Sequence, residues 1–232
     1  MKYRGIVFDK DGTLLDFNKT WLPIYLHAAL EFAEGDERLA GKLLSEHGFA
    51  PARSRFIGGS LLAAGNNRQI ARAWASQIGR HDHVDAISKR LNQIFNEQGS
   101  IHATAVAGLA DTLAQLKLAG HKLGVATADS HQGIVNTLQA FDVLQQFDFL
   151  AGYDSGHGVK PEAGMVLAFC EQTGLAAESV IVVGDNRHDI EMGRNAGAGL
   201  CVGVLTGTST RGDLEDIADI VFDDITALPA AL

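Results

Sequence analysis

Segments with the composition of buried strands alternate with helical segments over the second half of the chain. The expected strands lie at 122–127, 147–151, 179–184, 199–204 and 219–222, and the expected helices at 106–119, 131–140, 161–173 and 188–196. Residues 180–183 form an unbroken run of valine and isoleucine, which is typical of a strand buried on both faces. With a further strand at 3–9, the pattern predicts an α/β fold with a doubly wound parallel sheet.

The segment 16–98 has a different pattern of apolar residues. Apolar residues such as Trp21, Ile24, Tyr25 and Ala28 recur at helical spacing, and further helical stretches follow near 36–47, 66–79 and 83–97. No strand is expected in this segment. We therefore predict an α/β core made of residues 1–15 and 99–232, interrupted by an all-helical insertion over 16–98.

Composition limits the classes of partner. The chain has 232 residues and a formal net charge of −9, with no basic stripe that could neutralise nucleic-acid phosphates. No apolar run has the length of a membrane span, and the start of the chain lacks a signal-peptide pattern. The two cysteines, Cys170 and Cys201, are expected to be buried free thiols. These features predict a cytoplasmic protein that binds neither nucleic acid nor membranes and is a monomer or a homodimer.

Two carboxylates follow the first expected strand. Asp9 and Asp11 are separated by one residue, so on an extended segment both side chains can reach the same site. Two like charges this close need a cation or a shared proton. Mg²⁺ suits such a site because it is commonly bound by one or two carboxylates together with substrate phosphate oxygens.

Polar residues also follow the later strands. Thr127 ends the strand at 122–127, Asp185 and Asp189 follow the strand at 179–184, and Lys160 precedes Pro161, which is expected in the first turn of a helix. Parallel sheets bind ligands beyond the carboxyl ends of their strands. The sequence therefore predicts a single site that gathers all of these side chains.

Phosphoryl transfer accounts for this set of residues, because it requires positioning of the phosphate and neutralisation of its oxygens. Asp9 is the expected nucleophile, and Asp11 the general acid and base. Thr127 and Lys160 are expected to contact phosphate oxygens. The expected Mg²⁺ ligands are Asp9, Asp11, Asp185 and Asp189.

These motifs resemble those of the haloacid dehalogenase (HAD) superfamily, whose phosphatases use Mg²⁺ and an aspartyl-phosphate intermediate on a Rossmann-like core. The resemblance implies that the helical insertion is a type 1 cap. The run at 193–198, followed by Gly203 and Gly207, is similar to that of phosphoglycolate phosphatase-like members. Such members mostly carry an apolar residue where this chain has Lys10, and the Lys10 side chain is expected to point away from Asp9 and Asp11.

Other activities remain open within this resemblance. The metal-free dehalogenases of the superfamily lack the second aspartate, so Asp11 favours phosphoryl transfer. A phosphomutase shares all the motifs and is the main alternative. A non-enzymatic phospho-acceptor switch protein is a weaker one, because it would leave the insertion over 16–98 unexplained.

The substrate is expected to be a small phosphorylated metabolite, with phosphoglycolate as the best candidate. An arginine that binds a substrate carboxylate in a bidentate manner would suit it. The candidates in the helical insertion are Arg53, Arg55, Arg68 and Arg72.

Overall fold

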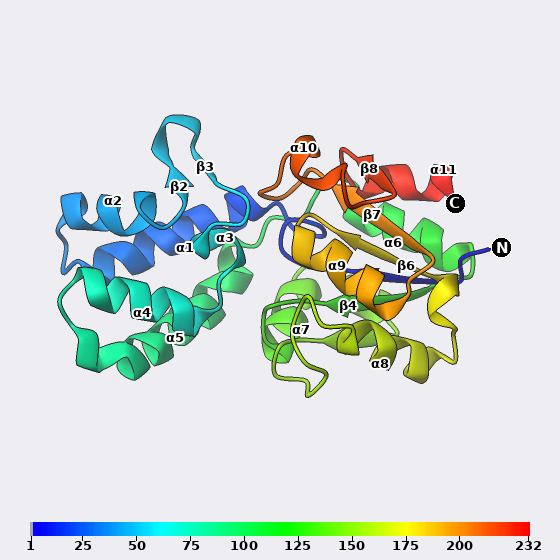
Figure 1. The fold of residues 1–232 in the computed structure, drawn as a ribbon, viewed down its shortest axis with the longest axis horizontal. Coiled ribbons are helices and arrows are strands. Elements are labelled where there is room, and N and C mark those ends of the chain that lie inside the picture. Colours follow the sequence, from blue (N-terminus) through cyan, green and yellow to red (C-terminus); the bar gives the residue numbers. More distant parts are fainter. Residues whose placement is uncertain (1) are drawn as a thin grey trace. The chain divides into compact units, whose positions relative to one another are not determined.

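The computed structural model describes residues 2–232, and the chain divides into two compact units. One unit contains the chain up to Asp16 together with Ala105–Leu232, and the other contains Phe17–Thr104. The first unit holds a six-stranded sheet and the second is mainly helical (Figure 1). The expected boundary between residues 98 and 99 is wrong, because it falls inside helix α5 (Val84–His102).

All strands of the large sheet are parallel, in the order β5-β4-β1-β6-β7-β8. Their bounds are β1 Gly5–Phe8, β4 Lys122–Ala126, β5 Phe149–Ala151, β6 Val180–Gly184, β7 Leu200–Val204 and β8 Ile220–Phe222. The strand order reverses between β1 and β6, which makes their carboxyl ends the expected position for a ligand. The predicted doubly wound α/β fold is confirmed.

Helices cover both faces of this sheet (Figure 1). The bounds are α6 Leu109–Leu118, α7 His131–Gln139, α8 Gly164–Thr173, α9 Arg187–Ala196, α10 Arg211–Leu214 and α11 Leu228–Ala231. Helices α6, α7 and α11 pack on the face that carries Ile6 and Phe8, whereas α8 and α9 pack on the face that carries Val7. Successive side chains of a strand point to opposite faces, so the apolar runs of β1 and β6 supply both cores.

The second unit has its own core around Trp74 and Phe56. Its helices are α1 Phe17–Phe32, α2 Glu37–Ser45, α3 Leu61–Ala64, α4 Asn67–Gln77 and α5. It also contains an antiparallel pair of short strands, β2 (Phe49–Ala50) and β3 (Arg55–Phe56). The expectation of an all-helical insertion is therefore wrong in this detail. Strands of two residues leave no alternating pattern that a sequence can reveal.

Short 3-10 helices complete the fold at Pro51–Arg53, His81–His83, Leu144–Gln146, Ala177–Ser179 and Ile225–Ala227. One helix start differs from the expectation. Helix α8 begins at Gly164, so Pro161 lies in the loop before it, after a cis peptide bond with Lys160.

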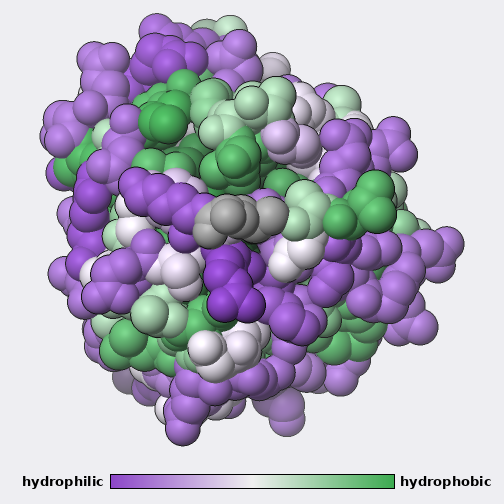
Figure 2. Space-filling view, turned by 90° about the vertical axis from the view of Figure 1, so that its right-hand side faces the viewer, coloured by the Kyte–Doolittle hydropathy of each residue, from purple (hydrophilic) through white to green (hydrophobic). Residues whose placement is uncertain are grey.

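The surface is mixed in character. Figure 2 shows hydrophilic and hydrophobic side chains interspersed over one face of the molecule. Cys170 and Cys201 are buried and unpaired, as expected. Over residues 2–232, none of the helices combines the length and the apolar character that crossing a membrane requires.

Leu113 and Leu118 provide a test of the core, since both lie on α6. Leu113 is fully buried and Leu118 is 91% exposed. Leu113→Ala is expected to lower the free energy of unfolding by about 2–5 kcal/mol, because it leaves a cavity beneath the sheet. Leu118→Ala is expected to change it by less than about 0.5 kcal/mol. Urea unfolding followed by circular dichroism measures both, and equal losses would contradict the packing.

Candidate active site

The candidate site lies at the carboxyl ends of three neighbouring strands. Asp9 directly follows β1, Thr127 follows β4, and Asp185 follows β6. The backbone N–H of Asp9 donates to the carbonyl of Val183 at 2.8 Å, which continues the strand pairing up to the first carboxylate. The topology thus gathers residues that are more than a hundred positions apart in the sequence.

Lys160 bridges two of the carboxylates. Its Nζ lies 2.5 Å from Oδ1 of Asp9 and 2.6 Å from Oδ1 of Asp189. All three side chains are buried, with Lys160 and Asp9 8% exposed and Asp189 2% exposed. A buried ammonium paired with two carboxylates offsets much of their mutual repulsion.

Burial and like charge shift the protonation of this cluster. Burial raises the pKa of Asp9 to about 7, with Lys160 opposing the shift and Asp189 and Asp11 adding to it. Burial, followed by the charges of Asp189 and Asp9, raises the pKa of Asp185 well above its ordinary value. Burial alone would lower the pKa of Lys160, but its two carboxylate partners raise it. Three ionised carboxylates would carry more negative charge than the single Lys160 ammonium neutralises, and burial and this repulsion favour protonation of Asp9 and Asp185.

Asp185 is enclosed by backbone. Its Oδ2 accepts a hydrogen bond from the backbone N–H of Thr208 at 2.9 Å. A Cβ at Gly207 would lie 1.8 Å from that oxygen, and one at Gly12 would lie 2.6 Å from the carboxylate. Only glycine at these two positions leaves room for the carboxylate. This requirement gives Gly207 a structural role that the sequence did not predict.

Asp189 serves the fold as well as the cluster. Its Oδ2 accepts from the backbone N–H of Asn186 at 3.0 Å, and Asn186 caps the start of α9 in a capping box. Its other oxygen, Oδ1, is the one that contacts Lys160. The cap fixes the carboxylate in place, so the lysine contact is made by a side chain that is already ordered.

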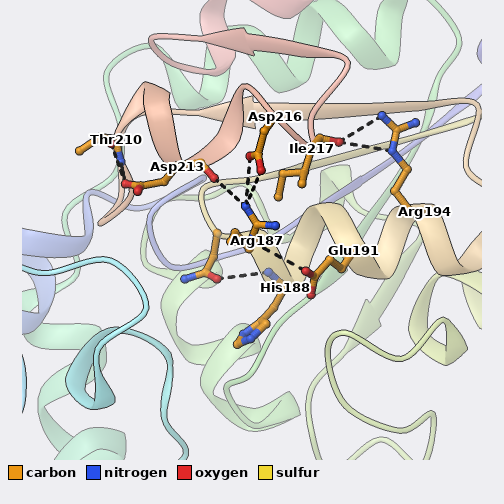
Figure 3. Close-up of polar contacts among 9 residues, drawn as sticks. Arg187, His188, Glu191, Arg194, Thr210, Asp213, Asp216 and Ile217 are labelled. Atoms are coloured by element: carbon orange, nitrogen blue, oxygen red, sulfur yellow. Dashed lines mark hydrogen bonds and ion pairs between the residues drawn. The ribbon is translucent and has the colours of Figure 1, made fainter.

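Exposed ion pairs hold the outer side of α9. Arg187 contacts Asp216 at 3.1 Å (Figure 3), and Arg194 contacts Asp219 at 2.7 Å. Exposed ion pairs contribute little to stability singly. These pairs link α9 to the segment 210–219, which follows the loop that carries Gly207.

The carboxylates are close enough to share a metal ion. One oxygen each from Asp9, Asp185 and Asp189 lies within 4.8 Å of the others, and all three residues are buried. An all-oxygen set with excess negative charge suits a hard divalent cation such as Mg²⁺. Asp11 is outside this group, and its role as a metal ligand stays a prediction.

Contrary to the expectation, the Lys10 side chain does not point away from the site. Its Nζ lies 2.8 Å from Oδ2 of Asp11 and 3.0 Å from Oδ2 of Asp129. Burial would lower the pKa of Lys10, but these two carboxylates raise it. The expectation failed because β1 ends at Phe8, so the chain turns at Lys10 and side chains no longer alternate. The contact of Asp129 with Lys10 was also not predicted from the sequence.

Thr127 is buried beside this second ion cluster. It is 1% exposed, and its hydroxyl oxygen accepts from the backbone N–H of Asp129 at 3.1 Å. A hydroxyl that accepts this bond keeps its own proton available for donation to another group. The expected contact with a phosphate oxygen is compatible with this arrangement and stays a prediction.

The candidate substrate arginines lie in the second unit. Arg53 and Arg55 lie on or beside the β2–β3 hairpin, whereas Arg68 and Arg72 are exposed on α4. Arg68 contacts the exposed Asp85 at 3.0 Å. The predicted role of these arginines in substrate binding is a proposal that the structure leaves untested.

Comparison with known proteins now assigns the family. The model of the haloacid dehalogenase-like hydrolase family matches residues 3–197, and the chain belongs to this family. The resemblance predicted from the motifs is confirmed.

Two relatives of the chain are named as phosphatases. The chain is 27% identical to the phosphoglycolate phosphatase of Shigella boydii serotype 4 (strain Sb227), with 99% of this chain and 92% of the relative covered. It is 25% identical to the pyrophosphatase PpaX of Bacillus cereus (strain B4264), with 85% and 81% covered.

Solved structures share the fold. A protein assigned as phosphoglycolate phosphatase from Haemophilus somnus 129pt superposes with a TM-score of 0.77 at 21% identity, with 100% of this chain and 98% of that chain covered. A protein assigned as β-phosphoglucomutase from Thermotoga maritima gives a TM-score of 0.71 at 20% identity, with 98% and 97% covered.

The raised pKa of Asp9 predicts how the stability of the metal-free protein depends on pH. The pKa is about 7 in the folded state and about 3.9 in an unfolded chain. Between these two values the folded state binds the extra proton, so the contribution of Asp9 to stability falls as pH rises from about 4 to about 7, by at most about 1.4 kcal/mol per pH unit. Asp9→Asn is expected to flatten this slope.

Urea unfolding between pH 5 and pH 8 in chelator measures the effect. The slope that remains in Asp9→Asn is expected to come from Asp185, whose pKa is raised in the same direction. A wild-type stability that rises over this interval would contradict the arrangement.

Proposed function

We propose that this protein is a Mg²⁺-dependent phosphatase that hydrolyses a small phosphate monoester through an aspartyl-phosphate intermediate on Asp9. The observation that carries the proposal is the buried cluster of Asp9, Asp185 and Asp189 around the ammonium of Lys160. Family membership and the phosphatase relatives support the same reaction class.

Asp9 is the nucleophile in this proposal. Its carboxylate oxygen attacks phosphorus, and Asp11 gives a proton to the leaving oxygen. Asp11 then takes a proton from the water that hydrolyses the phosphate from Asp9. Lys160 and Thr127 stabilise phosphate oxygens by charge and by hydrogen bonding.

The carboxylates of Asp9, Asp185 and Asp189 would hold the Mg²⁺ ion. When bound, the ion supplies positive charge that neutralises phosphate oxygens and lets Asp9 react as a carboxylate. The buried position of the site favours this electrostatic effect, since it lowers the local dielectric constant.

Phosphoglycolate is our best candidate substrate, and the relatives that carry its name support that choice. We assign substrate recognition to the unit Phe17–Thr104, acting as a cap, with Arg53, Arg55, Arg68 and Arg72 as candidates for the substrate carboxylate. A panel of phosphoglycolate, sugar phosphates, nucleotides and pyrophosphate tests the choice. Recovery of an isomerised phosphosugar in place of inorganic phosphate would favour a phosphomutase.

Asp9→Asn is expected to reduce turnover of p-nitrophenyl phosphate by at least about 10³-fold, because it removes the nucleophile. Phosphate release measures the effect, and circular dichroism shows that the variant is folded. Glu162→Gln is a suitable control, since it removes a carboxylate two residues from Lys160 without touching the cluster. Substantial Mg²⁺-dependent activity in Asp9→Asn would contradict the assignment.

Gly207→Ala tests the metal site without changing a ligand. The new Cβ would collide with Oδ2 of Asp185, so the carboxylate must move. We expect the Mg²⁺ concentration for half-maximal activity, and for half-maximal thermal stabilisation, to rise by about 10-fold or more. Gly41→Ala on α2 is the control, because nothing lies within 4 Å of its Cβ. Full activity in excess EDTA would contradict the proposed role of Mg²⁺ in the reaction.

A further inference from the structure

Lys10 is a buried cation that the proposed reaction does not use. Its side chain is 2% exposed, whereas those of its partners Asp11 and Asp129 are 15% and 25% exposed. A charge buried this deeply is tolerated only when it is paired, so the two contacts at 2.8 and 3.0 Å account for its presence.

Hydrogen bonds also hold the backbone of Lys10. Its carbonyl accepts hydrogen bonds from the N–H groups of Leu14 and Leu15, both at 3.0 Å. These bonds close the turn that carries Asp11. The lysine is thereby held at the base of the turn, and its Nζ reaches the carboxylate from a defined position.

The second partner, Asp129, is anchored on the neighbouring loop. Its Oδ1 accepts from the backbone N–H of Ser130 at 2.7 Å, and its own N–H donates to Thr127 at 3.1 Å. Its carbonyl accepts from the N–H of Tyr153 at 2.9 Å. Lys10 therefore joins the loop after β1 to an ordered loop after β4.

We propose that Lys10 is a positioning residue, held by Asp129, that keeps the Asp11 carboxyl group where it exchanges protons with the leaving oxygen. The inference rests on the proposed phosphatase activity. Lys10 keeps its own protons throughout. The proton on Asp11 passes to the oxygen whose bond to phosphorus breaks, while the new bond forms from Asp9, and Asp11 later recovers a proton from the attacking water.

Aryl phosphates distinguish this role from a merely structural one. The value of kcat/KM reports the steps up to departure of the leaving group, and a poor leaving group needs the proton from Asp11 most. Lys10→Met is expected to lower kcat/KM by about 3-fold for p-nitrophenyl phosphate and by about 30-fold or more for phenyl phosphate. A defect in folding would lower both values by the same factor.

Asp129→Asn is the second variant, and it leaves the contact between Lys10 and Asp11 in place. We expect a smaller loss with the same preference for phenyl phosphate, and we expect the double variant to be no worse than Lys10→Met alone. Lys117→Met is the control, because it removes an ion pair to Asp148 on the same unit, away from the cluster.

The outcomes separate the two proposals. Equal losses for both esters, or no loss, in Lys10→Met and Asp129→Asn would overturn the role of Lys10. The proposed function would still stand after such a result, provided that Asp9→Asn is inactive in the same assays. Activity that survives in Asp9→Asn would overturn the proposed function, and with it the inference.

Discussion

The buried contact of the Lys160 ammonium with Asp9 and Asp189 is the interaction on which the site depends. The parallel sheet brings Asp9 and Asp185 together at the ends of adjacent strands, and the capped start of α9 adds Asp189. Three buried carboxylates repel one another unless cations offset them. Lys160 supplies one positive charge, and the remaining negative charge is what makes the cluster suited to a divalent cation and to a phosphate.

The residues that shape the local structure of this site also position the side chains that are expected to react. Asp189 caps α9 with one oxygen and meets Lys160 with the other. Gly12 and Gly207 leave the space that the Asp185 carboxylate occupies. Changes at Gly12 and Gly207 are therefore expected to move the Asp185 carboxylate, whereas a change at Asp189 is expected to disturb both the cluster and the start of α9.

Much of this arrangement could be predicted from the sequence. The unbroken apolar runs indicated a sheet buried on both faces, and the polar residues that follow the strands indicated the site. The position of the Lys10 side chain could not be predicted, because alternation holds only while the backbone is extended, and β1 ends at Phe8. The hairpin at 49–56 was missed because its strands are too short to show a period. The end of α5 was missed because Gly99 lies within the helix without breaking it.

The central claim is that the phosphate passes through Asp9. Rapid mixing of the enzyme with p-nitrophenyl phosphate and Mg²⁺, followed by acid quenching and peptide mass spectrometry, tests it most directly. We expect transient phosphate on the peptide that contains Asp9, and none in Asp9→Asn. Turnover with no phosphorylated peptide at any time, or with phosphate on another residue, would contradict it.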